Sequence, residues 1–126
     1  MKTLQQILND KQHQEIISIT PDKLVFDALV IMAEKRIGAL AVMENNKLVG
    51  IFSERDYARE VALKNKASRT TNINEVMTTT LIYAQAADLV DSAMSTMSNK
   101  RIRHLPVMDR DNKVGMLTIG DLVKST

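Results

Sequence analysis

The 126-residue sequence contains no cysteine, which excludes disulfide scaffolds, cysteine-based zinc sites and thiol nucleophiles. Aromatic residues make up only 3 % of the chain, so few side chains are available to stack on single-stranded nucleic acid. The 17 basic and 15 acidic residues are interspersed, and no basic stripe that could follow a nucleic-acid backbone stands out. We therefore expect no nucleic-acid partner.

Long apolar runs are also missing. The longest uncharged ones, residues 28–33 and 38–43, are far shorter than a membrane-spanning helix, and the N-terminus lacks the apolar core of a signal peptide. We expect a cytoplasmic protein with no membrane partner. The only histidines are His13 and His104, and no P-loop, HExxH motif or nucleophile elbow is present, so we expect no enzyme activity. The 44 % of hydrophobic residues nevertheless predicts a packed core.

The chain repeats itself at an offset of 65 residues without a gap. Most of the matched positions are apolar, which by itself indicates a duplicated core pattern. Examples of matched pairs are Ile17 with Ile82, Leu40 with Leu105, Gly50 with Gly115 and Asp56 with Asp121.

Each repeat has the pattern strand, helix, strand, strand, helix. In the first repeat we expect a strand at 16–19, a helix that starts at Thr20-Pro21-Asp22 and a hairpin of strands 39–43 and 48–52. A second helix should then run from Ser53 to about Lys64. The second repeat predicts a hairpin of strands 105–108 and 114–117, followed by a helix from Thr118 to the end. Asparagine and aspartate residues at 44–47 and 109–112 are typical of tight hairpin turns.

Short leading helices are expected before each repeat, at 4–8 and 74–77, and the polar stretch 65–71 is interpreted as a linker. These assignments divide the chain into residues 1–66 and 67–126. A unit of about 60 residues is marginal alone, so the two copies are expected to pack sheet to sheet around a pseudo-twofold axis.

One asymmetry concerns the first helix of each repeat. Val30 and Ile31 lie beside its buried stripe, whereas their counterparts are Ser95 and Thr96. The extra apolar strip indicates either a homodimer contact or a slightly wider core stripe.

A Gly-x-x-(Ser/Thr)-x-x-Asp pattern ends each hairpin. It contains Ser53 and Asp56 in the first repeat and Thr118 and Asp121 in the second. Because Ser or Thr followed three residues later by an acidic residue resembles a capping box, the pattern has a purely structural interpretation. It also has a functional one, since a carboxylate at a strand-to-helix turn can accept hydrogen bonds from the two hydroxyls of a ribose.

Cations precede each hairpin. Lys35-Arg36 and Lys100-Arg101 suit a solvated helix C-terminus, where positive charge complements the helix dipole. Arg103 and His104 are different, because the first repeat has Gly38 and Ala39 in their place. A cationic pair at the head of a strand is suited to binding a phosphate.

The duplicated segments, IGALAVM with LVGIFSERDY and IRHLPVM with KVGMLTIGD, resemble the cystathionine-β-synthase (CBS) domain family, and the pair resembles a Bateman module. The resemblance implies an α/β (α+β) fold of two pseudo-twofold-related β-α-β-β-α motifs. It also implies a homodimer that binds an adenosine-containing ligand between its motifs and regulates an effector protein whose identity the sequence does not give. The expected regulatory ligand is AMP, with ADP, ATP, NAD or S-adenosylmethionine as alternatives, and no catalytic cofactor is implied.

The resemblance also carries the site onto particular residues. In one cleft Asp56 and Ser53 would hold the ribose, with Arg55 adding charge, the backbone of Ile82 would border the adenine, and Arg103 with His104 would face the phosphate. The other cleft would combine Asp121 and Thr118 with the strand at 17–20 and with Gly38 and Ala39, which carry no charge, so it should bind more weakly, stay empty or take a ligand whose phosphate is held elsewhere. The full expected nucleotide-binding set is Ile17, Thr20, Gly38, Ala39, Ser53, Arg55, Asp56, Ile82, Ile102, Arg103, His104, Pro106, Thr118, Ile119 and Asp121.

An alternative function remains open from the residues alone. If both aspartates serve only as helix caps, the repeats form a ligand-free dimerisation scaffold. The two possibilities differ in whether a nucleotide raises the thermal stability of the protein.

Overall fold

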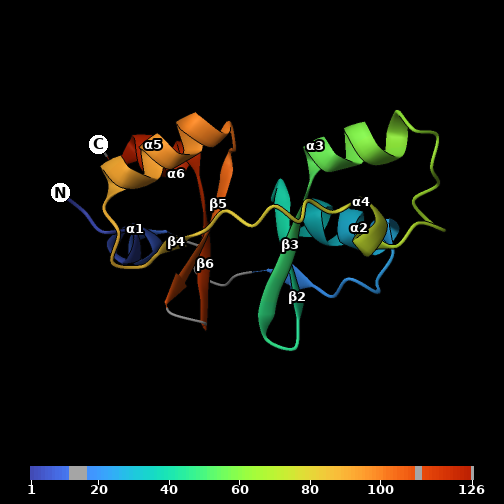
Figure 1. The fold of residues 1–126 in the computed structure, drawn as a ribbon, viewed down its shortest axis with the longest axis horizontal. Coiled ribbons are helices and arrows are strands. Elements are labelled where there is room, and N and C mark those ends of the chain that lie inside the picture. The colour runs from blue at the N-terminus through green and yellow to red at the C-terminus, as the bar shows by residue number, and fades with distance from the viewer. Residues whose placement is uncertain (12–16, 110–111, 126) are drawn as a thin grey trace. The chain divides into compact units, whose positions relative to one another are not determined.

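The computed structural model describes residues 1–11, 17–109 and 112–125. They form two compact units (Figure 1), each with one three-stranded sheet and helices, which confirms the expected α+β fold. The first-repeat unit is Ile17–Leu81, and the second-repeat unit combines Met1–Ile16 with Ile82–Thr126. In the described part of the chain, no helix is long and apolar enough to cross a membrane.

The two units contain corresponding elements. The first-repeat unit consists of β1 (Ser18–Ile19), α2 (Val25–Lys35), β2 (Ala39–Glu44), β3 (Lys47–Ser53), α3 (Glu54–Asp56), the π-helix η1 (Tyr57–Ala62) and α4 (Ile73–Val76). The second-repeat unit consists of α1 (Leu4–Asp10), β4 (Ala84–Gln85), α5 (Val90–Lys100), β5 (His104–Asp109), β6 (Asn112–Thr118) and α6 (Ile119–Lys124).

Both sheets have the same topology. β1 pairs parallel with β2, which pairs antiparallel with β3, and β4, β5 and β6 repeat this order. The predicted hairpins are confirmed, with strands slightly longer than expected. Asn45 and Asn46 both have positive φ, 53° and 63°, as a two-residue turn of the type favoured in hairpins requires. The turn predicted at 109–112 falls partly on residues 110–111, outside the described residues.

The first helix of each repeat buries one stripe. Val25, Ala28 and Met32 of α2 are at most 5 % exposed, as the helical spacing predicts. The predicted start of this helix at Thr20-Pro21-Asp22 is wrong, because those residues form a turn in which the Lys23 N–H donates to the Thr20 carbonyl (3.2 Å). The helix begins three residues later, after Leu24, whose side chain cannot cap it.

In both units, a backbone carbonyl of a leading segment accepts a hydrogen bond from the first turn of this helix. In the first-repeat unit, the N–H of Val25 donates to the carbonyl of Thr71 (2.9 Å). In the second-repeat unit, the N–H of Val90 donates to the carbonyl of Lys2 (3.2 Å). Both bonds satisfy an N–H of the first helical turn, which has no partner within the helix.

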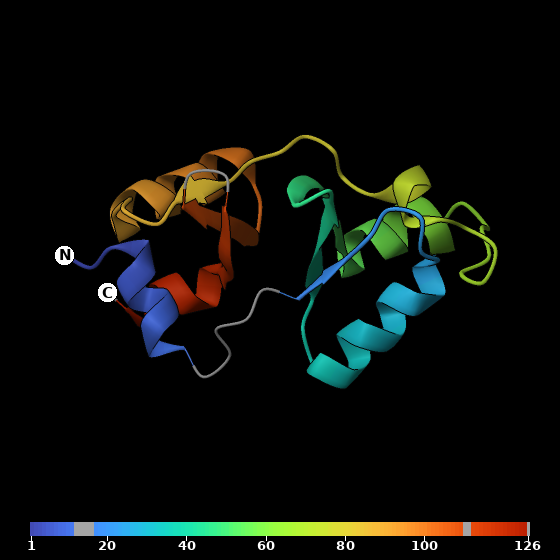
Figure 2. The ribbon, with the colours of Figure 1, turned by 90° about the horizontal axis from the view of Figure 1, so that it is seen from below.

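The leading segments therefore pack with the opposite repeat from the one they precede in sequence. Segment 1–11 lies with repeat two, where Figure 2 shows α1 in dark blue beside α6 in red, and segment 71–78 lies with repeat one. The sequence-based boundaries at 1–66 and 67–126 divide the chain differently. The compact units follow the backbone bonds, because Leu4 donates to the Asp88 carbonyl (2.9 Å) and Ile73 to the Lys23 carbonyl (2.8 Å).

The stretch 65–71, interpreted as a linker, is also part of the first-repeat unit. The N–H of Phe26 donates to the Ser68 carbonyl (3.0 Å), and the Arg69 guanidinium lies 3.9 Å from the centre of the Phe26 ring. Thr71 is only 5 % exposed and its hydroxyl donates to the Ala67 carbonyl (2.8 Å). The stretch is polar because its groups make these local bonds.

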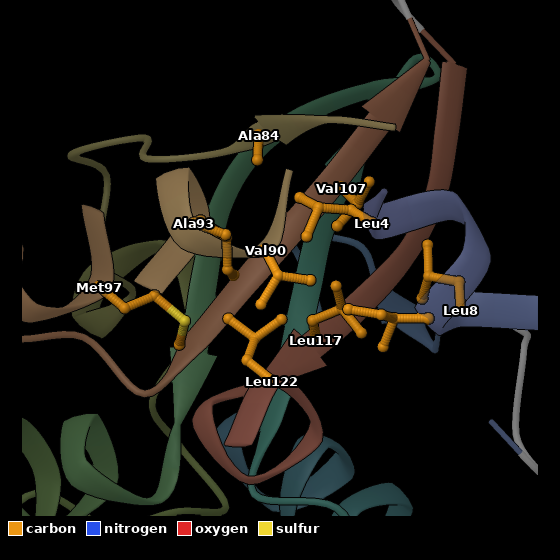
Figure 3. Packing of buried hydrophobic residues seen from close by; sticks show 11 residues of the cluster. Leu4, Leu8, Ala84, Val90, Ala93, Met97, Val107, Leu117 and Leu122 are labelled. Carbon is orange, nitrogen blue, oxygen red and sulfur yellow. The ribbon is translucent and has the colours of Figure 1, made fainter. Parts of the chain in front are cut away.

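Each unit has its own apolar core. In the second-repeat unit, Leu4 and Leu8 of α1 point among Val107, Leu117 and Leu122 (Figure 3), and all five are buried. In the first-repeat unit the buried cluster is built from Ile19, Val25, Ala28, Met32, Leu40, Val42, Phe52, Val61, Ile73 and Val76. Burial of α1 and α4 side chains thus holds the leading segments in place.

The second helices of the repeats differ. The helix expected from Ser53 to about Lys64 is instead the short α3 followed by the π-helix η1, in which the N–H of Leu63 donates to the carbonyl of Ala58 (3.0 Å). The counterpart α6 is α-helical from Ile119 to Lys124.

Candidate ligand-binding site

The Ser/Thr-x-x-Asp patterns form capping boxes in both units. The Ser53 hydroxyl accepts a bond from the N–H of Asp56 (3.1 Å), and Oδ2 of Asp56 accepts one from the N–H of Ser53 (2.9 Å). The same two bonds join Thr118 and Asp121, at 3.1 Å and 2.8 Å. Both carboxylates are thereby fixed at the point where the hairpin ends and the helix begins.

Asp56 has hydroxyl groups as its further partners. The Ser53 hydroxyl lies 3.1 Å from Oδ2 of Asp56, and the Thr78 hydroxyl donates to Oδ1 (2.8 Å). Asp56 is half-buried and Thr78 is exposed. A ligand hydroxyl could take the place of the Thr78 hydroxyl without separating opposite charges.

Asp121 has a cation as its further partner. The Lys11 ammonium donates to Oδ2 of Asp121 (2.8 Å) and to the carbonyl of Met116 (3.0 Å). The side chains of Lys11 and Asp121 are 24 % and 21 % exposed. Burial acts to raise the pKa of Asp121, but the Lys11 ammonium and the Thr118 hydrogen bonds outweigh it and hold that pKa below its usual range.

The head of each hairpin lies beside the carboxylate of its own unit. Ala39 faces Ser53 across the first hairpin, and the N–H of Glu54 donates to the Gly38 carbonyl (3.0 Å). His104 faces Thr118 across the second. The first-repeat unit therefore carries no side-chain cation at its strand head.

In the second-repeat unit, the N–H of Ile119 donates to the carbonyl of Arg103 (3.1 Å). The structure thus brings the backbone of Arg103 and His104 to Ile119 and Thr118, within their own unit. Their assignment to the same ligand as Asp56 joins residues of different units and stays a prediction.

The remaining predicted residues lie in one unit or the other, and Ile17 and Ile82 occupy equivalent positions. Ile17 and Ile82 are half-buried against their own cores, and the Ile17 carbonyl accepts a bond from the N–H of Ala41 (3.3 Å). Ile102 closes α5, because its N–H donates to the Met97 carbonyl (3.1 Å), and Pro106 is buried in β5. Arg55 is exposed at the first turn of α3.

Thr20 lines a separate pocket of about 440 Å³ in the first-repeat unit. The pocket has an apolar side made by Ile19, Ile31 and Met43, and a polar rim that includes Lys23. Gly38 and Ala39, which are predicted for the same cleft, do not line this pocket. The described residues include no group of three or more acidic or histidine side chains that could hold a metal ion.

Two residues that touch the carboxylates, Thr78 and Lys11, were not predicted. Each follows a leading helix, and the signal that could have found them is an offset of 69 residues, at which Thr3 aligns with Asn72 and Leu8 with Met77. Leu8 and Met77 are the side chains next to Gly115 and Gly50, respectively. The residues just after these helices therefore reach the end of the hairpin.

The family model of the CBS domain matches two consecutive segments, residues 10–63 and 73–125. The chain belongs to the CBS domain family. Together the matched segments contain both hairpins and both capping boxes, so the chain is a tandem CBS pair.

Among curated relatives, this CBS pair is 37 % identical over 111 residues to the CBS domain-containing protein CBSX3, mitochondrial, of Arabidopsis thaliana. That match covers 84 % of this chain and 54 % of the plant protein, so the chain spans about half of that protein's length. It is 28 % identical over 115 residues to the CBS domain-containing protein YhcV of Bacillus subtilis, covering 91 % of this chain and 81 % of YhcV.

Two solved structures are informative. A CBS-domain protein from Burkholderia ambifaria MC40-6 is 42 % identical, with a TM-score of 0.94 and coverage of 98 % of this chain and 93 % of that one. The CBS domain pair of protein MJ0100, solved in complex with 5′-methylthioadenosine and S-adenosyl-L-methionine, is 26 % identical, with a TM-score of 0.82. That match covers 99 % of this chain and 95 % of the MJ0100 pair.

Proposed function

We propose that this CBS pair is a regulatory, non-catalytic module that binds an adenosine-containing ligand through Asp56. The observation that carries the proposal is a half-buried carboxylate fixed by a capping box, in a family where the MJ0100 pair binds two adenosyl compounds. The ribose hydroxyls donate to the Asp56 carboxylate, where the Thr78 hydroxyl now donates. Arg103 and His104 are the proposed phosphate ligands.

AMP is the proposed regulatory ligand, with ATP and NAD next. Binding is passed to an effector protein through a homodimer, for which the exposed Val30 of α2 is a candidate contact because it is 39 % exposed. Its companion Ile31 packs against the first-repeat core and only half of the predicted apolar strip is therefore open.

A thermal-shift screen tests the proposal. The purified protein is heated with AMP, ADP, ATP, S-adenosylmethionine, NAD or NADH, alongside the variants Asp56→Ala, Arg103→Ala and the exposed control Arg59→Ala. We expect one adenosyl ligand to stabilise the wild type and the control, by about 2.7 kcal/mol at a hundredfold excess over its Kd. Asp56→Ala should lose most of this stabilisation, and Arg103→Ala should lose part of it when the ligand carries phosphate.

The capping boxes themselves favour a second candidate function, a ligand-free scaffold. In that case Ser53→Ala and Asp56→Ala would each lower stability by about 1 kcal/mol through loss of the cap, and no nucleotide would shift the melting temperature. Ser53→Ala separates the two functions, because it weakens the cap but keeps the carboxylate. A ligand shift that is only reduced in Ser53→Ala, which loses one of the two predicted ribose partners, and is lost in Asp56→Ala supports the sensor.

A further inference from the structure

Among the residues that the structure describes, no ion pair at Asp56 corresponds to the Lys11–Asp121 contact. In the second-repeat unit an ammonium lies 2.8 Å from the carboxylate and is also bonded to the Met116 carbonyl. In the first-repeat unit the partner is the Thr78 hydroxyl, which is neutral. Any ligand hydroxyl that approaches the two carboxylates therefore meets different competitors.

The free-energy cost of binding a ligand hydroxyl therefore differs between Asp56 and Asp121. A neutral ligand hydroxyl exchanges for the Thr78 hydroxyl at nearly equal strength, because both are uncharged donors. At Asp121 the same hydroxyl must compete with the Lys11 ammonium, so both donor and acceptor of the displaced bond are charged, whereas at Asp56 only the acceptor is charged. Displacing Lys11 would also leave its ammonium without its carboxylate partner in a partly buried position.

An anionic ligand meets a different situation. Lys11 and Asp121 line a pocket of about 570 Å³ that lies entirely within the second-repeat unit. Lys2 and Lys124 line it as well, so it offers three ammonium groups against the carboxylates of Asp10 and Asp121. A phosphate in this pocket would give Lys11 a new partner when a ribose hydroxyl takes its place on Asp121.

We propose that Lys11 is a specificity-determining residue that makes the Asp121 site reject uncharged nucleosides and accept phosphate-bearing ones. The inference rests on the proposed function, because it takes Asp121 to be a ribose-binding carboxylate like Asp56. It assigns the two carboxylates to different ligand classes. Asp56 accepts the ribose of neutral and charged adenosyl compounds, whereas Asp121 accepts the ribose of a nucleotide.

The test isolates the Asp121 site in an Asp56→Asn background and uses two probes that differ in charge, 5′-methylthioadenosine and AMP. Calorimetry gives the affinity of each probe for Asp56→Asn alone and combined with Lys11→Met. We expect Lys11→Met to strengthen 5′-methylthioadenosine binding by on the order of tenfold and to lower the preference for AMP over it. Lys64→Met is the matched control, because it removes an exposed lysine that pairs with Glu60 in the first-repeat unit, away from the Asp121 pocket.

The outcomes distinguish a failure of this inference from a failure of the proposed function. An unchanged preference in Lys11→Met, or an Asp56→Asn protein that binds neither probe although the wild type binds one, overturns the inference while the proposed function stands. A wild type that binds neither probe overturns the inference, and one that also binds no ligand of the thermal-shift screen overturns the proposed function. If Lys11→Met folds poorly, Lys11→Gln keeps most of the side chain and the Met116 bond while removing the charge, and the same change in preference is expected.

Discussion

The two units of this CBS pair share a backbone and differ at their carboxylates. Both have the same sheet order, both hold the first helix with a carbonyl of the leading segment, and both close the hairpin with a capping box. They differ in the partner of the carboxylate, a threonine hydroxyl in one and a lysine ammonium in the other. The duplicated scaffold is thus set by backbone bonds, which leaves the side chains at its two sites free to diverge.

The strand heads add to this difference. Gly38 and Ala39 place no charge at the head of the first hairpin, whereas Arg103 and His104 stand at the head of the second. With Lys11 bonded to Asp121, the second-repeat unit differs from the first in the basic residues around its capping box.

The largest expected effect compares the two cores. Phe52 and Leu117 occupy equivalent positions and are both fully buried. We expect Phe52→Ala to lower the free energy of unfolding by about 3–5 kcal/mol and Leu117→Ala by about 2–5 kcal/mol, because each leaves a cavity. Urea denaturation measures both, with Leu63→Ala as the control, since Leu63 is 82 % exposed. A loss below 1 kcal/mol for either core variant would contradict the assigned packing.

Alanine substitutions of the two hairpin glycines, Gly50 and Gly115, should lower stability by different amounts. The difference measures how tightly each leading segment is held against its hairpin. A Cβ at Gly50 would lie 2.9 Å from the Thr78 carbonyl oxygen, which is backbone, and 2.8 Å from the Met77 sulfur. The three atoms nearest to a Cβ at Gly115 would all belong to the Leu8 side chain, the closest being its Cδ2 at 2.6 Å. Because a side chain moves more easily than a paired backbone, we expect Gly50→Ala to cost about 1–3 kcal/mol and Gly115→Ala less.

Differential scanning calorimetry of the two alanine variants checks that order. Adding Leu8→Ala to Gly115→Ala should recover little stability, because the leucine also fills the core. Equal losses for the two glycine variants would show that segment 71–78 yields as easily as a side chain.

Much of each unit could be predicted from the sequence, because the apolar spacing and the Asn-Asn turn act locally. The start of α2 could not, since Thr20-Pro21-Asp22 is a good helix start and Leu24 is a poor one. The carbonyl of Thr71, far away in sequence, decides where that helix begins. The carboxylates could be found by their motif, but their partners Thr78 and Lys11 were missed, because both arrive from the exchanged leading segments, which the 65-residue offset does not align.

The contribution of the Lys11–Asp121 ion pair to stability should depend on pH. The pKa of Asp121 is lowered in the folded protein, so its bonds to Lys11 stabilise the fold above the ordinary value of 3.8 and stop doing so as the pH falls through the folded pKa. We expect Lys11→Met to lower stability by no more than about 1 kcal/mol at neutral pH and to match the wild type at the acid end. Melting temperatures between pH 2 and 7 measure this.

The control for the acid experiment is Lys2→Met. Its ion pair with Asp10 has side chains that are 50 % and 63 % exposed, and such pairs contribute little. A Lys11→Met variant whose deficit stays constant down to pH 2 would show that the lysine acts by packing and not by charge.

The smallest expected effect should be the same in both units. Arg36 and Arg101 end α2 and α5 with φ of 55° and 54°, in the left-handed region that favours glycine. Replacing either arginine by glycine relieves roughly 1 kcal/mol of backbone strain but removes a cation that interacts favourably with the helix C-terminus. We expect a net gain of a few tenths of a kcal/mol for Arg36→Gly and Arg101→Gly, measured by chemical denaturation. Since the helix ends superpose in conformation, unequal gains would locate a further side-chain role of one arginine, which Arg36→Lys and Arg101→Lys would then separate from its backbone role.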